Sequence, residues 1–199
     1  MPRQMIPQYE LKAEDIRAYT LNILKGHVKL EVAGYRCTTE IILDVVVKAS
    51  AESNSIEAAS NDLQFAADSK SIREYLNTAL DNQALHEQIN EMNTALAECI
   101  PESVPRTQFD LAIDFHDESF YGKQAGLREM TCSGQAKGTT HFIRIASAYV
   151  IWRQVRLTLA LHYMLSHESA LDILQILLQP LQELGFHQIR VIYLDKGFA

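Results

Sequence analysis

The spacing of apolar residues changes about halfway along this chain of 199 residues. Up to about residue 100, apolar residues recur every three to four positions, which is typical of amphipathic helices. From Phe109 onward the apolar runs are continuous or alternating, which is typical of strands. The change predicts an all-helical domain followed by a sheet-forming domain. Pro101 and Pro105 lie where the pattern changes, and we expect the domains to be residues 1–105 and 106–199.

The second half predicts four strands and one long helix. We expect strands at about 109–115, 141–151, 156–163 and 188–194, and a helix from about Glu168 to Leu184, capped by Ser166 or His167. That helix is apolar nearly all round, which predicts deep burial. A helical crossover implies that the fourth strand enters the sheet in parallel, while the first three form an antiparallel meander. The fold class is therefore α+β, and the strand-strand-strand-helix-strand order is the front part of a ribonuclease H-like mixed α/β sheet.

The first half predicts five helices. Helical spacing places them at about 13–25, from Thr38 or Thr39 to about 51, at 55–63, at 69–80, and around 85–96. The pair 55–80 has the proportions of a helix-turn-helix, with Lys70 and Arg73 near the start of its second helix, where a recognition helix contacts DNA. Most two-helix corners bind nothing, and the nearby Asp62, Asp68 and Glu74 oppose DNA binding.

Two aspartates interrupt or end apolar strands. Asp114 lies inside the first strand, where a carboxylate is costly unless it is paired or bound to a metal. Asp195 follows the fourth strand, at the carboxyl end where α/β sheets place ligands. If the first and fourth strands are neighbours, the two carboxylates face each other and suit Mg²⁺ or Mn²⁺. The alternative for a lone Asp at a strand end is a turn or cap residue, and this alternative remains open for Asp195.

Composition and charge exclude some classes of protein. No run of about 18 apolar residues lacks charges, since even Ile41–Val47 contains Asp44, so we expect no transmembrane helix. The amino terminus has no apolar signal region, and three distant cysteines argue against a disulfide framework. The net charge of −7 weakens a simple case for nucleic-acid binding. Within the second half, however, the basic residues gather between Lys123 and Arg156, where the only acid is Glu129.

Three ordered motifs in residues 109–199 resemble the catalytic domain of bacterial and archaeal insertion-sequence DDE transposases, in the retroviral-integrase superfamily. The motifs are Ala-Ile-Asp-Phe-His-Asp at 112–117 with Tyr-Gly-Lys at 121–123, Lys-Gly-Thr-Thr-His-Phe at 137–142, and Leu-Asp-Lys-Gly-Phe at 194–198. The resemblance implies that Asp114 and Asp195 are catalytic carboxylates and metal ligands. It also implies an amino-terminal DNA-binding module. The family pattern then needs a Glu on a helix further downstream, which these residues do not contain, so we expect an amino-terminal transposase fragment that is inactive alone.

Several basic side chains are candidates for contacting DNA. The candidates are Lys70, Arg73, Lys123, Arg128, Lys137 and Arg144, with Arg153 and Arg156 extending the track. A solvated hairpin face is the alternative for the cations of the second half. His116 shares a strand face with Asp114, so it is a candidate for reaching a metal or a phosphate. Trp152 is interpreted as a packing residue rather than one inserted at a flipped base.

The leading hypothesis is DNA transposition by metal-dependent phosphodiester cleavage and strand transfer, with Mg²⁺ or Mn²⁺ as cofactor. The expected partners are the DNA of the element ends and target, together with possible self-association and no membrane. The expected location is the prokaryotic cytoplasm, on the chromosome. One alternative is a DNA-binding or regulatory transposase-derived protein without catalysis, and another is a pseudogene product without function.

Overall fold

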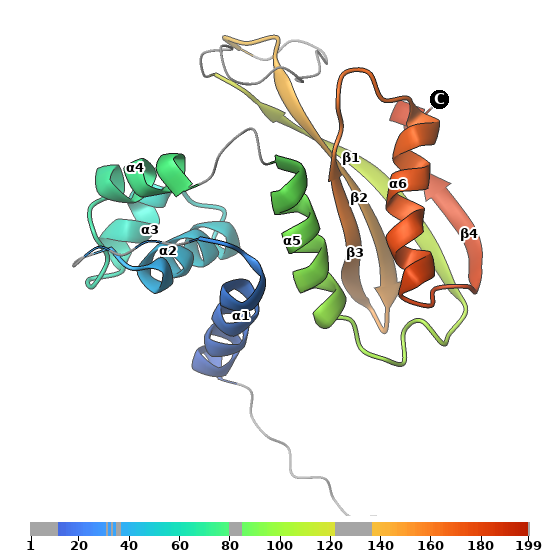
Figure 1. Ribbon diagram of the computed structural model, residues 1–199, viewed down its shortest axis with the longest axis horizontal. Coiled ribbons are helices and arrows are strands. Elements are labelled where there is room, and N and C mark those ends of the chain that lie inside the picture. Colours follow the sequence, from blue (N-terminus) through green and yellow to red (C-terminus); the bar gives the residue numbers. More distant parts are fainter. Residues whose placement is uncertain are drawn as a thin grey trace, which may run out of the picture. The chain divides into compact units, whose positions relative to one another are not determined.

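The computed structural model describes residues 12–30, 32, 34, 37–79, 85–121 and 137–198. Over these residues the chain is α+β, with six helices and a four-stranded mixed sheet, followed by a short 3₁₀ turn η3 at Lys196–Phe198 (Figure 1). The helices are α1 (Ala13–His27), α2 (Thr39–Ala51), α3 (Ile56–Asp62), α4 (Ser69–Ala79), α5 (Leu85–Glu98) and α6 (Ala170–Glu183). The strands are β1 (Phe109–Ser119), β2 (Phe142–Trp152), β3 (Val155–Tyr163) and β4 (Ile189–Leu194).

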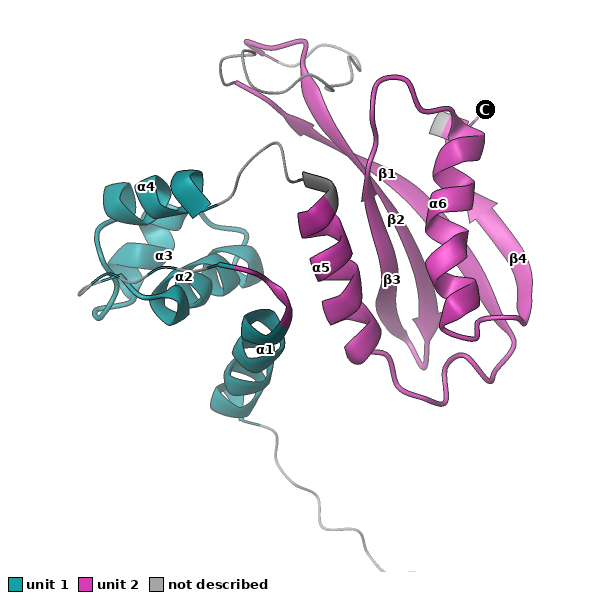
Figure 2. Cartoon of the chain, in the orientation of Figure 1, with its two compact units in different colours: residues 1–26, 30–79 teal, residues 27–29, 80–199 magenta. Residues whose placement is uncertain are grey.

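Contacts divide the chain into two compact units, residues 1–26 with 30–79, and residues 27–29 with 80–199 (Figure 2). The sequence-based boundary at 105/106 assigned α5 to the helical domain, and this differs from the contacts. Helix α5 packs along β3. The side chain of Asn93 on α5 donates to the Leu161 carbonyl at 2.9 Å and accepts from the Leu161 N–H at 2.8 Å. Because β3 is an edge strand, these bonds satisfy backbone groups that no other strand pairs, and they tie α5 to the sheet.

Helices α2 and α3 of the helical unit are each preceded by a residue that caps them. The Thr38 side chain accepts from the Ile41 N–H before α2, and Ser55 does the same for Ala58 before α3. The sequence predicts helix starts at Thr38 or Thr39 and at Ser55, and the structure places Thr38 and Ser55 one residue before each helix, as its N-cap. Ile42, Val45, Ala59 and Ile72 are fully buried, so the apolar stripes of α2, α3 and α4 form this unit's core.

The sheet has the order β3-β2-β1-β4. Strands β1, β2 and β3 form the expected antiparallel meander, and β4 pairs with β1 in parallel, as the helical crossover predicts. Figure 1 shows α6 lying across one face of the sheet. Its buried residues Ile173, Leu177 and Leu181 belong to the same core cluster as Leu111 and Ile113 of β1.

Two expectations about α6 are wrong. Its N-cap is Ser169, which forms a reciprocal capping box with Asp172, so neither Ser166 nor His167 caps it. The helix is also not buried all round, since Leu171 is 65% exposed and Ile176 is 37% exposed. Only one side of α6 faces the sheet, and an apolar composition alone does not report how much surface the neighbouring elements cover. None of the helices that the structure describes combines the length and hydropathy that a membrane span needs.

Candidate active site

Strand β1 presents two chemically different faces. Phe109, Leu111 and Ile113 are buried in the core cluster beneath α6. Successive strand residues point to opposite sides, so Ala112 and Asp114 project from the other face, which we call the open face. Asp114 is half-buried there, beside Ser147 of β2.

Asp195 reaches the neighbourhood of Asp114 through the parallel pairing of β1 with β4. The last register pair is Ile113 with Leu194, and the Asp195 N–H continues the ladder by donating to the Ile113 carbonyl at 3.1 Å. One step further, Asp114 and Asp195 stand at corresponding positions on adjacent chains, which in a sheet lie about 4.8 Å apart. The expectation that the strand containing Asp114 and the strand before Asp195 are parallel neighbours is confirmed.

A short turn fixes the backbone on both sides of Asp195. The Lys196 N–H donates to Asp195 Oδ1 at 2.6 Å, and the Phe198 N–H donates to the Asp195 carbonyl at 3.0 Å. The Phe198 ring then stacks on Phe115 of β1, with ring centroids 4.3 Å apart. Sequence reasoning missed this stack, because Phe115 and Phe198 are far apart in the chain and nothing in either motif signals the partner of its phenylalanine.

Arg144 of β2 lies beside this stack. Its Nε and Nη2 donate to the two carboxylate oxygens of Asp117 at 2.6 and 2.8 Å, and its guanidinium lies 5.3 Å from the Phe115 ring centroid. The bonds to Asp117 raise the pKa of Arg144, and the negative charge of Asp195 adds to the rise. Arg144 was a candidate DNA contact, but its side chain is only 21% exposed and its guanidinium is held by a protein carboxylate.

The other predicted site residues lie in different surroundings. His116 forms an exposed pair with Glu118 at 2.8 Å. Trp152 packs against the core cluster, which agrees with its interpretation as a packing residue. Lys137 is exposed, whereas Lys123 and Arg128 lie outside the described residues.

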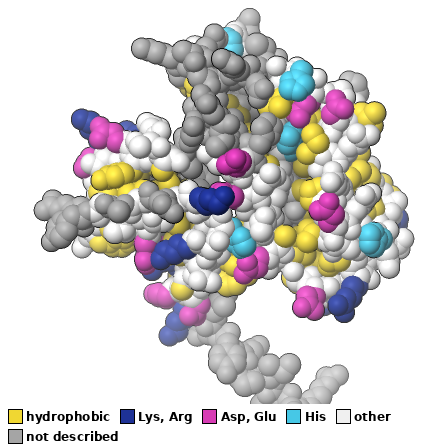
Figure 3. All heavy atoms as spheres, in the orientation of Figure 1, with side chains coloured by type: hydrophobic (Ala, Val, Ile, Leu, Met, Phe, Trp, Pro, Cys, Tyr) yellow, Lys and Arg dark blue, Asp and Glu magenta, His cyan; other side chains and the backbone are white. Residues whose placement is uncertain are grey.

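The candidate recognition helix α4 carries cations that acidic neighbours offset. Arg73 lies 3.7 Å from Glu57 of α3, and Lys70 lies 3.9 Å from Glu74 on the next turn. Asp68 caps α4 by accepting from the Ser71 N–H and hydroxyl. Basic and acidic side chains are also intermixed on the face in Figure 3, over the part of the chain that the structure describes. The face drawn in Figure 3 presents no continuous basic track among the residues that the structure describes.

Asp114 and Asp195 could contribute their carboxylate oxygens as ligands of a metal ion. Within the described residues, no group of three or more His, Cys, Asp or Glu side chains is gathered in a way that could hold a metal ion. The two carboxylates supply oxygen ligands of the kind that Mg²⁺ and Mn²⁺ prefer, but these are too few to complete the coordination shell of such an ion.

Comparison with known proteins identifies no relative of this chain: no family model, no curated protein and no solved structure matches it.

Proposed function

We propose that this chain carries part of the catalytic sheet of a DDE-type transposase, which cleaves and joins DNA phosphodiesters with divalent metal ions. The observation that carries the proposal is the register of β1 and β4. It brings Asp114 and Asp195 to corresponding positions on adjacent parallel chains. The order β3-β2-β1-β4, with helix α6 connecting β3 to β4, is also the order of the first four strands in a ribonuclease H-like fold, and it supports this proposal.

Asp114 and Asp195 would hold the metal through their carboxylate oxygens. When bound, such ions stabilise the attacking and leaving oxygens of an in-line phosphoryl displacement. The contribution of the chain is to hold the two carboxylates in place. The ladder bond to Ile113 and the stacking of Phe198 on Phe115 restrain the backbone around Asp195. The proposal also needs a third carboxylate, and the described residues bring none to this pair.

Manganese binding tests the proposal without requiring a known DNA substrate. Titration of Mn²⁺ into the 199-residue chain, followed by electron paramagnetic resonance, should show binding that Asp114→Asn and Asp195→Asn each weaken by about tenfold or more. A lost carboxylate removes both a ligand and a negative charge. The matched controls are Asp110→Asn and Asp117→Asn, because each of these carboxylates is on the same strand but is held by an arginine. Equal Mn²⁺ binding by the parent and both site variants would contradict the proposal.

The second candidate function is a DNA-binding or regulatory protein without catalysis. It is favoured by the two-carboxylate donor set in the described part of the chain and by the capped helix pair α3–α4. DNA binding by the parent, together with Mn²⁺ binding that ignores Asp114 and Asp195, would support this second function over the first.

A further inference from the structure

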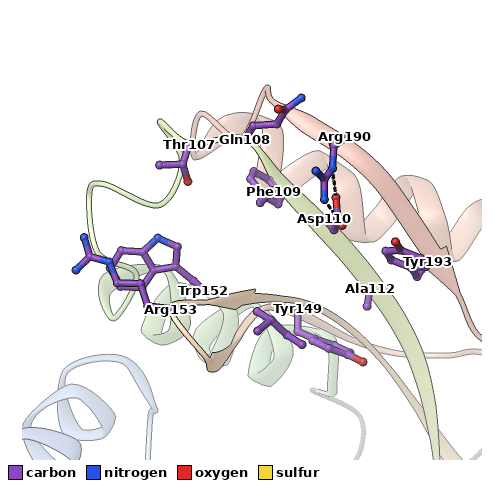
Figure 4. A pocket seen from close by; sticks show the side chains of 11 residues that line it. Thr107, Gln108, Phe109, Asp110, Ala112, Tyr149, Trp152, Arg153, Arg190 and Tyr193 are labelled. Atoms are coloured by element: carbon purple, nitrogen blue, oxygen red, sulfur yellow. Dashed lines mark hydrogen bonds and ion pairs between the residues drawn. The ribbon is translucent and has the colours of Figure 1, made fainter.

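A pocket of about 380 Å³ opens on the same sheet face as Asp114. Ala112 forms its floor, and the register places Tyr149 of β2 and Tyr193 of β4 opposite Ala112 from its two sides. Figure 4 shows the two tyrosines on either side of this small side chain. Tyr193 is 57% exposed. The pocket therefore has an aromatic side chain on each side of a small alanine, and this arrangement leaves room for a flat group.

Two arginines lie against aromatic rings that line this pocket, those of Tyr149 and Trp152. The guanidinium of Arg156 lies 3.7 Å from the Tyr149 ring centroid, and that of Arg153 lies 4.3 Å from the Trp152 ring centroid. Within the described part of the chain, neither arginine forms an ion pair with a carboxylate. Arg190, at the pocket's other side, is instead neutralised by two bonds to Asp110. Aromatic walls beside uncompensated arginines are the combination that binds single-stranded nucleic acid, through base stacking and phosphate attraction.

The pocket is aligned with the two aspartates. Ala112 precedes Asp114 by two residues on the same strand face, so the pocket floor and the Asp114 backbone are about 7 Å apart at the usual strand rise. That distance is comparable with the step between successive nucleotides of an extended strand. A phosphodiester at Asp114 and Asp195 would therefore bring a neighbouring base to Ala112. A base inside a duplex is stacked on both faces and paired along its edge, so only a base that has left the duplex stack and lost its pair fits.

We propose that the Tyr149–Ala112–Tyr193 pocket holds the unpaired base of the nucleotide adjoining the phosphodiester at Asp114 and Asp195. This inference rests on the proposed function for its substrate, which is DNA. It adds that the strand is unpaired at this point, and that Tyr193 and Ala112 determine whether the base is accepted.

The test uses a single-stranded hexadeoxythymidylate with one internal 2-aminopurine, titrated with the 199-residue chain in EDTA. Stacking on tyrosine should quench the 2-aminopurine fluorescence. Tyr193→Ala should weaken binding about tenfold and abolish the quench, whereas Tyr193→Phe, which keeps the ring, should retain both. Ala112→Leu should block the pocket floor and have the effect of Tyr193→Ala. Tyr121→Ala is the matched control, because Tyr121 is an exposed tyrosine outside the pocket.

The outcomes separate this inference from the proposed function. Unchanged affinity and quench in Tyr193→Ala and Ala112→Leu would overturn the pocket assignment, whatever the Mn²⁺ titration gives. The assignment would also be overturned if the chain bound the duplex form of this sequence more tightly than the single strand, and if Tyr193→Ala left that duplex binding unchanged. Because the oligonucleotide titration contains no metal, failure of Mn²⁺ binding would count against the catalytic proposal alone. Circular dichroism of each variant checks that the fold is retained.

Discussion

Among the described residues of the helical unit, Asp44 is the most deeply buried carboxylate, with only 5% of its side chain exposed. It accepts a hydrogen bond from Arg17 Nε at 2.6 Å and a second from Arg17 Nη2. These bonds raise the pKa of Arg17. In the sequence, Asp44 only marks an interruption of an apolar helix, and nothing there identifies Arg17 of the preceding helix as its partner.

Removing this partner should destabilise the helical unit. Arg17→Met leaves the Asp44 carboxylate buried without its donors, at an expected cost of about 1–3 kcal/mol, because the half-exposed Arg17 lets some water reach the site. Thermal unfolding measures the change. The double variant Arg17→Met with Asp44→Leu should recover most of the loss. A single variant as stable as the parent would mean that solvent already satisfies Asp44.

The two aspartates of the candidate site were predictable from sequence for a different reason. Asp114 breaks an apolar run, and Asp195 follows another, so each is visible without knowing its neighbours. The surrounding contacts were not predictable in the same way. The pairing of Arg144 with Asp117 and the stacking of Phe115 on Phe198 depend on the register between strands. A one-residue shift of register would move each side chain to the opposite face.

At the scale of elements, the strands and most helix starts follow from local signals. Helices α2 and α3 begin within one residue of the expected starts, after the caps Thr38 and Ser55, because a hydroxyl directly before an apolar helical pattern is a local feature. Helix α6 shows the limit of this reasoning. Ser166 and Ser169 both precede its apolar pattern, and only the reciprocal bonds between Ser169 and Asp172 distinguish the real cap.

These two serines allow a matched test of the cap. Ser169→Ala should lower the free energy of unfolding of the sheet unit by about 1 kcal/mol, because the Asp172 N–H loses its acceptor in the first turn of α6. Ser166→Ala, three residues earlier and outside the capping box, should change it by less than about half as much. Chemical denaturation followed by circular dichroism measures both. Equal losses in the two variants would contradict the assignment of Ser169 as the cap.

The same capping box predicts a pH dependence. Hydrogen bonds from the Ser169 hydroxyl and N–H lower the pKa of Asp172 below its ordinary value. A carboxyl with a depressed folded-state pKa stabilises the fold above its unfolded-state value of about 3.9, and this contribution is lost as the pH falls through the folded-state pKa. Asp172→Asn should therefore flatten the acid limb of a stability-against-pH curve below about pH 4. An unchanged acid limb would show that other carboxylates account for the loss.

At the scale of the whole molecule, the helical and strand-forming halves predicted from apolar spacing are real, but their boundary does not coincide with the boundary between the two compact units. The α-helical pattern of residues 85–96 is correct, yet α5 belongs by its contacts with the sheet. Periodicity reports the type of an element and not the element against which it packs. The bidentate bonds of Asn93 to an edge strand 68 residues away are a tertiary feature, and no local pattern in α5 signals them.

The net charge of −7 opposes DNA binding by the chain as a whole. Binding to duplex DNA should be weak and should fall steeply with salt, since each phosphate neutralised by a cation adds about 0.9 to the salt slope. If α4 is a recognition helix, replacing both Lys70 and Arg73 with Ala should weaken binding and flatten the slope by up to about 1.8. Glu57 and Glu74 already offset these two cations, so the flattening should fall below that limit. Lys12→Ala with Arg106→Ala is the control, since both side chains are exposed and lie outside α4. Fluorescence anisotropy across a salt series measures the slopes, and equal slopes for the two double variants would exclude α4 from the DNA interface.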